Sequence, residues 1–259
     1  MVFLDDNPMN KELEALYSTM PQDLVQYILD YNATRKPDSK GRITLITNPF
    51  WLKVPEEYAT AKKRILMINQ ETYRWHGEFS SKSTNKVMQY YATFIENVLH
   101  HYKKPTPIWD KFRDLYTLAL KQGIAIIPNN IGKIGYVRKT KQGEYEGCNG
   151  FKKEGVNFHH WVNDVFFKEI EILKPDLILF FCGPKYDKYI DRRFEDNGLP
   201  KPKRERVLAD ISSRQFAQLE VPGFPPMYRT YHPGYLRRNS GEPWVKAINA
   251  EIERLIKSL

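Results

Sequence analysis

Cysteine is nearly absent from this chain, because Cys148 and Cys182 are the only two among 259 residues. Two cysteines are too few for a disulfide framework, a four-cysteine zinc site or a cubane iron–sulfur cluster. Cys182 lies in an apolar run and is predicted to be a small core residue. This usage fits a reducing compartment, so we expect a cytoplasmic protein without metal, iron–sulfur cluster or other cofactor.

Long apolar runs are also missing. None approaches the roughly 18 residues that a membrane-spanning helix needs, and the start at Met1 lacks the basic and apolar regions of a secretory signal. The content of 41% hydrophobic residues, with 16 Tyr, 14 Phe and 5 Trp, nevertheless favours a substantial core over disorder. We expect a single α/β domain over residues 1–259, monomeric and without a membrane partner.

Acidic residues are outnumbered, with 31 Asp and Glu against 40 Lys and Arg, which gives a formal net charge of +9. A basic protein favours anionic partners, of which nucleic acid is the commonest. The segment Lys201–Arg238 holds eight of these cations and few acids. This stretch is either part of a nucleic-acid surface or an ordinary solvated face.

Several catalytic motifs are absent. There is no phosphate-loop motif, no Gly-x-Gly-x-x-Gly fingerprint and no Gly-x-Ser-x-Gly elbow. His76-Gly77-Glu78 matches the His-x-Glu of zinc deaminases, but their Pro-Cys-x-x-Cys partner is missing. His159 and His160 are neighbours that point apart on a helix, so they are predicted to mark a helix start.

Four apolar runs are predicted to be strands, and each ends in residues that suit a loop: 64–68, 124–127, 177–181 and 227–231. The first three are almost continuously apolar, as in strands covered on both faces. Amphipathic spacing predicts helices over 10–31, split at Pro21, and over 86–102, 110–121, 160–173 and 243–259. Residues 48–55 are predicted to be irregular. The alternation predicts a three-layer α/β/α sandwich with a central four-stranded, mostly parallel sheet and a helical N-terminal extension over residues 1–60.

In such sheets ligands bind beyond the carboxyl ends of the strands. This rule points to the residues that follow each predicted strand: Gln70-Glu71, Asn129-Asn130, Gly183 and His232. We therefore expect the functional site there.

Two of these segments resemble the signature motifs of the uracil-DNA glycosylase superfamily. Asn69-Gln70-Glu71-Thr72-Tyr73 is similar to the family's Gly-Gln-Asp-Pro-Tyr, and His232-Pro233-Gly234-Tyr235-Leu236 is similar to His-Pro-Ser-Pro-Leu. The family places an Asn between them, at the end of the second core strand. The order agrees from about Arg64 to Leu236. Glu71 stands where the family has its catalytic Asp, and Gly234 and Tyr235 replace the Ser and second Pro.

The resemblance implies excision of uracil or another modified base from single- or double-stranded DNA. Glu71 would stabilise positive charge on the sugar, and His232 would stabilise the departing base anion. The amide of Asn130, or as second choice Asn129, would bind the base edge. The resemblance also implies substrate contacts from Gln70, Tyr73 and Phe79. Trp75 and His76 are the other aromatic candidates beside Phe79. Leu236 stands at the position of the intercalating Leu, and Arg237 and Arg238 would hold phosphates.

Each of these residues also has a structural interpretation: Glu71 as a surface carboxylate, His232-Pro233 and Asn129-Asn130 as turns, and Leu236 as a packing residue. Two other functions remain open. One is non-catalytic nucleic-acid binding on the same fold. The other is hydrolysis of a small nucleoside-like molecule, with Gly132–Asn157 as a lid.

Overall fold

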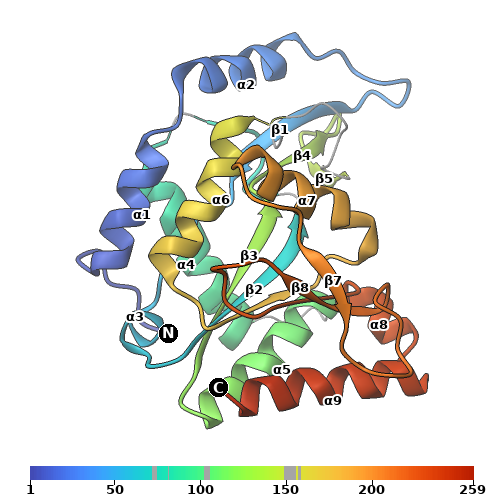
Figure 1. Ribbon diagram of the computed structural model, residues 1–259. Coiled ribbons are helices and arrows are strands. Elements are labelled where there is room, and N and C mark those ends of the chain that lie inside the picture. Colours follow the sequence, from blue (N-terminus) through green and yellow to red (C-terminus); the bar gives the residue numbers. More distant parts are fainter. Residues whose placement is uncertain (72–74, 81, 102–105, 149–155, 157–158) are drawn as a thin grey trace.

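The computed structural model describes residues 1–71, 75–80, 82–101, 106–148, 156 and 159–259. The predicted α/β class is confirmed, since helices alternate with strands along most of the chain (Figure 1). The helices are α1 (Pro8–Ser18), α2 (Gln22–Thr34), α3 (Glu56–Thr60), α4 (Thr84–His100), α5 (Pro107–Lys121), α6 (His160–Leu173), α7 (Asp187–Asp196), α8 (Pro233–Arg238), α9 (Pro243–Lys257) and the short 3-10 helix η2 (Pro184–Tyr186). The strands are β1 (Ile43–Pro49), β2 (Arg64–Glu71), β3 (Ala125–Gly132), β4 (Ile134–Lys139), β5 (Tyr145–Gly147), β6 (Leu177–Phe180), β7 (Lys203–Arg206), β8 (Phe216–Glu220) and β9 (Met227–Thr230).

The main sheet is mixed, with six strands in the described residues in the order β3-β2-β6-β9-β8-β7. The four predicted strands are neighbours here: β2 pairs in parallel with β3 and β6, and β6 pairs in parallel with β9. The predicted number of four strands was wrong, because β8 and β7 extend the sheet in antiparallel pairing. Strand β7 has the sequence Lys-Arg-Glu-Arg. Charged side chains are typical of an exposed edge strand, and they gave no apolar signal to detect.

A second sheet corrects two further predictions. Strand β1 pairs with β4, and β4 with β5, all antiparallel. Residues 1–60 are therefore not purely helical, because they include β1. The prediction that residues 48–55 are irregular is wrong for residues 48 and 49, which end this strand. The proposed lid over 132–157 includes the paired strands β4 and β5, while residues 149–155 and 157 lie outside the described part.

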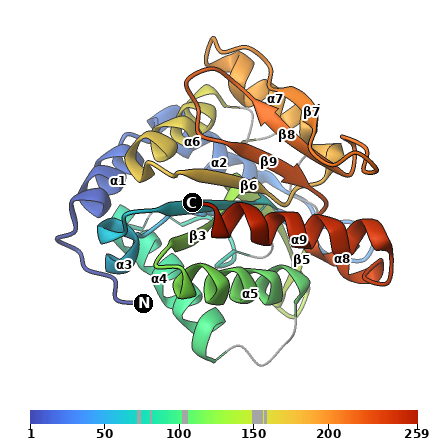
Figure 2. The ribbon, with the colours of Figure 1, turned by 60° about the horizontal axis from the view of Figure 1, so that its bottom comes forward.

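Helices lie on both faces of the main sheet. Figure 2 shows α1 and α6 over one face and α4 and α5 over the other. The split at Pro21 is confirmed, because this residue is extended and precedes α2. Apolar side chains of the helices and of β2, β3, β6 and β9 form one continuous core, in which Cys182 is buried as predicted. Within the described ranges no helix has the length and apolar character needed to cross a bilayer.

Candidate functional site

A cavity of about 550 Å³ opens at the carboxyl edge of the main sheet. Its walls come from the end of β2, the turn after β6, the loop before β8 and the segment after β9. The lining residues are Gln70, Cys182, Gly183, Pro184, Lys185, Tyr186, Arg214, Tyr231, His232, Tyr235 and Arg238. The cavity therefore lies where parallel α/β sheets bind ligands, and it joins the segments around Gln70 and His232.

His232 is the N-cap of α8, and its ring orientation is fixed by the backbone. Its Nδ1 accepts a hydrogen bond from the Gly234 amide at 3.0 Å. A Cβ on residue 234 would lie 3.1 Å from that Nδ1, so glycine allows the close approach. Burial, and secondarily the charge of Arg238, lowers the pKa of His232 below its ordinary value. A neutral imidazole whose Nδ1 accepts carries its proton on Nε2, which makes that atom a donor.

Glu71 is connected to the cavity through Tyr186. The Tyr186 hydroxyl donates a hydrogen bond to Oε2 of Glu71, although Glu71 itself is not among the lining residues. Burial raises the pKa of Tyr186, and the neighbouring Glu71 raises it further, so the phenol keeps its proton. Gln70 is oriented separately, because its Nε2 donates to the Cys182 carbonyl at 2.7 Å. The segment after β6 thus fixes the carboxyl end of β2 beside the cavity.

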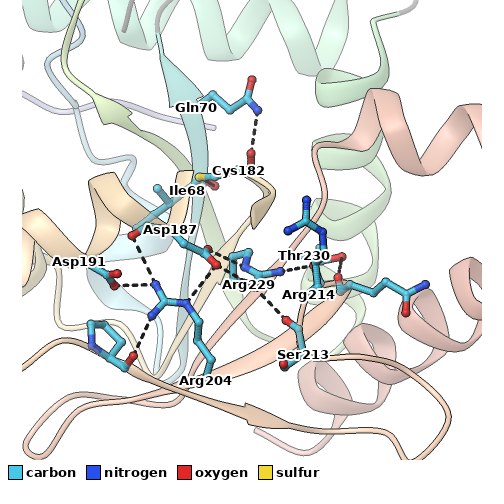
Figure 3. Close-up of polar contacts among 12 residues, drawn as sticks. Ile68, Gln70, Cys182, Asp187, Asp191, Arg204, Ser213, Arg214, Arg229 and Thr230 are labelled. Carbon is cyan, nitrogen blue, oxygen red and sulfur yellow. Dashed lines mark hydrogen bonds and ion pairs between the residues drawn. The ribbon is translucent and has the colours of Figure 1, made fainter. Parts of the chain in front are cut away.

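The loop that carries Arg214 is held by a buried arginine, as Figure 3 shows. Arg229, only 1% exposed, pairs with both carboxylate oxygens of Asp187 at 2.9 and 3.1 Å. The same guanidinium donates to the carbonyls of Arg214 at 2.8 Å and Ser213 at 2.9 Å. Fully bonded and paired, Arg229 has a structural role, and the backbone at Arg214 is fixed beside the cavity.

The polarity of the lining changes from the floor of the cavity to its rim. Cys182 and Gly183 are buried, and Gln70 and His232 are half-buried. The exposed lining residues are Lys185, Arg214, Tyr235 and Arg238. Tyr235 is 40% exposed and packs against Tyr231, with ring centroids 4.5 Å apart. The cavity therefore combines a polar, neutral interior with an aromatic and cationic rim.

No family model matches this chain, and no curated protein sequence matches it either. Among the described residues, no group of three His, Cys, Asp or Glu side chains is close enough together to hold a metal ion.

The predicted base-reading asparagines do not line the cavity. Asn129 is fully buried, where its amide donates to Glu169 at 3.0 Å and accepts from Lys133. Asn130 pairs in register with Asn69 of β2, and both are 5% exposed. Neither amide atom of Asn69 has a hydrogen-bond partner in the described structure. An unpaired buried amide is unfavourable by about 1–3 kcal/mol, so Asn69 is a stronger candidate for binding a ligand or water than Asn129.

The predicted DNA-contacting residues separate into different environments. Leu236 is 5% exposed and belongs to the hydrophobic core, so in this conformation it is a packing residue and not an exposed wedge. Tyr235 is the exposed neighbour. Arg237 pairs with Asp110 at 3.2 Å, whereas Arg238 lines the cavity.

The predicted aromatic contacts after the first motif also lie elsewhere. Phe79 is half-buried and its amide bonds to the Ile46 carbonyl at 2.8 Å, beside β1. Trp75 is buried and donates to the Pro49 carbonyl, and His76 stacks on Tyr90. Tyr73 lies outside the described residues. Tyr186, Lys185 and Arg214 line the cavity but belong to no motif in the sequence. The strand-end rule predicts Gly183, which is close in sequence to Lys185 and Tyr186.

Proposed function

We propose that this protein hydrolyses the N-glycosidic bond of a nucleotide, in the manner of the uracil-DNA glycosylase superfamily, and that its fold is a three-layer sandwich of that type. The observation that carries the proposal is the cavity at the sheet edge. Gln70 of the first family-like segment and His232 of the second line this one cavity, and Glu71 is bonded to Tyr186 in its wall.

The residue types suit the reaction. Cleavage leaves positive charge on the sugar and negative charge on the base. The Nε2–H of a neutral His232 stabilises the departing base by donating to its oxygen, as electrostatic stabilisation requires. Glu71, oriented by the Tyr186 hydroxyl, stabilises the sugar cation and positions water. Gln70 and Tyr231 contact the base inside the cavity.

A second candidate is binding of nucleic acid without bond cleavage. It is favoured by the position of Glu71, which accepts a hydrogen bond from the Tyr186 hydroxyl and does not line the cavity. In that case the same pocket receives a base but no carboxylate reaches the sugar.

Base release distinguishes the two functions. The full chain would be incubated with single- and double-stranded oligonucleotides that contain uracil, hypoxanthine or xanthine, and abasic sites would be detected by alkaline cleavage. Glu71→Gln and His232→Ala should each reduce release by about a hundredfold or more, the usual contribution of a positioned acid or base. Tyr186→Phe should cause a smaller loss, because Glu71 stays in place without its donor.

The matched control is Arg206→Ala. Arg206 is exposed on β7 and does not line the cavity, so its removal should leave release unchanged. Release that persists in both Glu71→Gln and His232→Ala would exclude this mechanism. Oligonucleotide binding with no abasic product on any substrate would favour the second candidate.

A further inference from the structure

Three cations at the rim of the cavity have no acidic partner among the described residues. Lys185, Arg214 and Arg238 come from three separate segments: the turn after β6, the loop before β8 and helix α8. Within the described part of the chain, none of them forms an ion pair, and none of the residues lining the cavity is acidic. The mouth of the cavity therefore carries uncompensated positive charge.

Nearby arginines show the opposite arrangement. Arg204 pairs with Asp187 at 3.1 Å and Asp191 at 2.6 Å, and Arg229 pairs with Asp187. The acids of α7, Asp187 and Asp191, thus neutralise Arg204 and Arg229 (Figure 3). In the described structure they form no ion pair with the three cations at the rim. This contrast separates structural arginines from those available to a ligand.

We propose that Lys185, Arg214 and Arg238 form a subsite for the phosphate of a nucleotide whose base occupies the cavity interior. The identity of the base rests on the function proposed above; the anion subsite rests on the cations alone. Guanidinium groups bind phosphate through paired N–H donors, and lysine adds a point charge. A neutral floor with a cationic rim matches a molecule that is uncharged at one end and anionic at the other.

Arg229 acts as a positioning residue for this subsite. It donates to the carbonyls of Ser213 and Arg214 from a buried site and cannot itself reach a ligand. Thr230 supports the same loop, since its hydroxyl donates to the Gln215 carbonyl at 3.1 Å. The backbone at Arg214 is therefore held by β9, the strand that leads directly into His232.

Equilibrium binding to the full chain tests the subsite without any bond cleavage. Deoxyuridine, deoxyuridine 5′-monophosphate, inorganic phosphate and a uracil-containing oligonucleotide would be titrated by calorimetry. The monophosphate should bind more tightly than the nucleoside. Arg214→Ala should weaken monophosphate binding about ten- to a hundredfold, the range for a charged hydrogen bond, and leave nucleoside binding unchanged. Arg214→Lys should restore part of the loss, and Arg206→Ala should have no effect.

Arg229→Lys provides the test of positioning. It should lower the ratio of monophosphate to nucleoside affinity, a ratio that a general loss of stability does not change. Comparison of the monophosphate with the oligonucleotide shows whether the phosphate belongs to a free nucleotide or to a strand.

Each result separates this inference from the proposed function. Base release from oligonucleotides with no dependence on Arg214 overturns the subsite and leaves the hydrolase standing. Monophosphate binding that depends on Arg214, without base release, supports the subsite and removes the hydrolase. Equal loss of nucleoside and monophosphate affinity in Arg214→Ala, or no binding of the monophosphate at all, overturns the subsite.

Discussion

The state of His232 depends on two neighbours that act on different atoms. The Gly234 amide fixes the tautomer by donating to Nδ1, and Arg238 adds a positive charge that opposes protonation. Burial acts in the same direction and is the larger cause. The ring is therefore neutral at neutral pH, so that Nε2 carries the proton that the proposed chemistry needs.

Arg238→Ala should raise the pKa of His232 towards its ordinary value of 6.5, because one of the two opposing effects is removed. The titration of the His232 ring would be followed by NMR. A lowered pKa in the folded state means that the unfolded chain binds more protons below about pH 6.5. The contribution of His232 to the free energy of unfolding is therefore fully present above that pH. It is lost as the pH falls from 6.5 through the lower pKa of the folded state.

Arg237→Ala is the matched control, because this adjacent arginine is paired with Asp110 and does not affect His232. An unchanged His232 pKa in Arg238→Ala would mean that solvent screens the guanidinium, and burial alone would then explain the lowered value.

Among the elements, β3, α6 and α1 meet at a buried charge cluster. Lys133, which follows β3 directly, pairs with Glu169 of α6 at 2.5 Å, and the two side chains are 2% and 0% exposed. Tyr17 of α1 donates to the same carboxylate at 2.5 Å, and Asn129 donates at 3.0 Å. Burial lowers the pKa of Lys133, whereas Glu169 raises it. This cluster gives Asn129 a structural role and ties the N-terminal helix to the main sheet.

Lys133→Met should destabilise the protein by about 3–5 kcal/mol, because it leaves the Glu169 carboxylate buried without a cation. The double variant Lys133→Met/Glu169→Leu should recover much of that loss. Urea unfolding measures both. Lys139→Met breaks the exposed pair with Glu78, and should change stability by less than about 1 kcal/mol. A small loss in Lys133→Met would imply that Tyr17 and Asn129 are sufficient to stabilise the carboxylate.

The burial of each strand explains whether the sequence predicts it. Strands β2, β3, β6 and β9 were found because they lie in the middle of the sheet or are buried along their length, which demands apolar runs. Strand β7 was not predicted because it is charged and lies at an edge of the sheet. Strand β1 belongs to the second sheet, for which the sequence shows no alternating apolar pattern.

The same limit applies to the site. Gln70 lies at the end of β2 and His232 lies just after β9, so the strand-end rule predicts the position of both residues. Arg214 and Tyr186 are placed at the cavity by contacts between segments distant in sequence. Arg229 donates a hydrogen bond to the Arg214 carbonyl, and the Tyr186 hydroxyl donates one to Glu71. Asn129 failed as a base contact because its partner, Glu169, lies on a helix that no local pattern connects to it.

At the scale of the molecule, a net charge of +9 attracts any polyanion, so affinity for nucleic acid alone does not identify a site. What distinguishes the cavity is that its three rim cations are unpaired in the described structure and converge on one opening. Specific contacts release counterions from the phosphates that they neutralise, whereas a diffuse field releases few. The salt dependence of binding therefore reports how many cations touch the strand.

Replacing Lys185, Arg214 and Arg238 together by Ala should make the slope of log K against log salt shallower by about 2 for single-stranded DNA, at about 0.7 per phosphate contact. Fluorescence anisotropy with a short labelled oligonucleotide at several salt concentrations measures the slope. The control is the triple replacement of Lys11, Lys62 and Lys121 by Ala, which removes the same charge from exposed positions that do not line the cavity. It should weaken binding slightly and leave the slope nearly unchanged. Equal changes in the two triple variants would mean that the strand is held by overall charge, and the cavity mouth would then have no special part in binding nucleic acid.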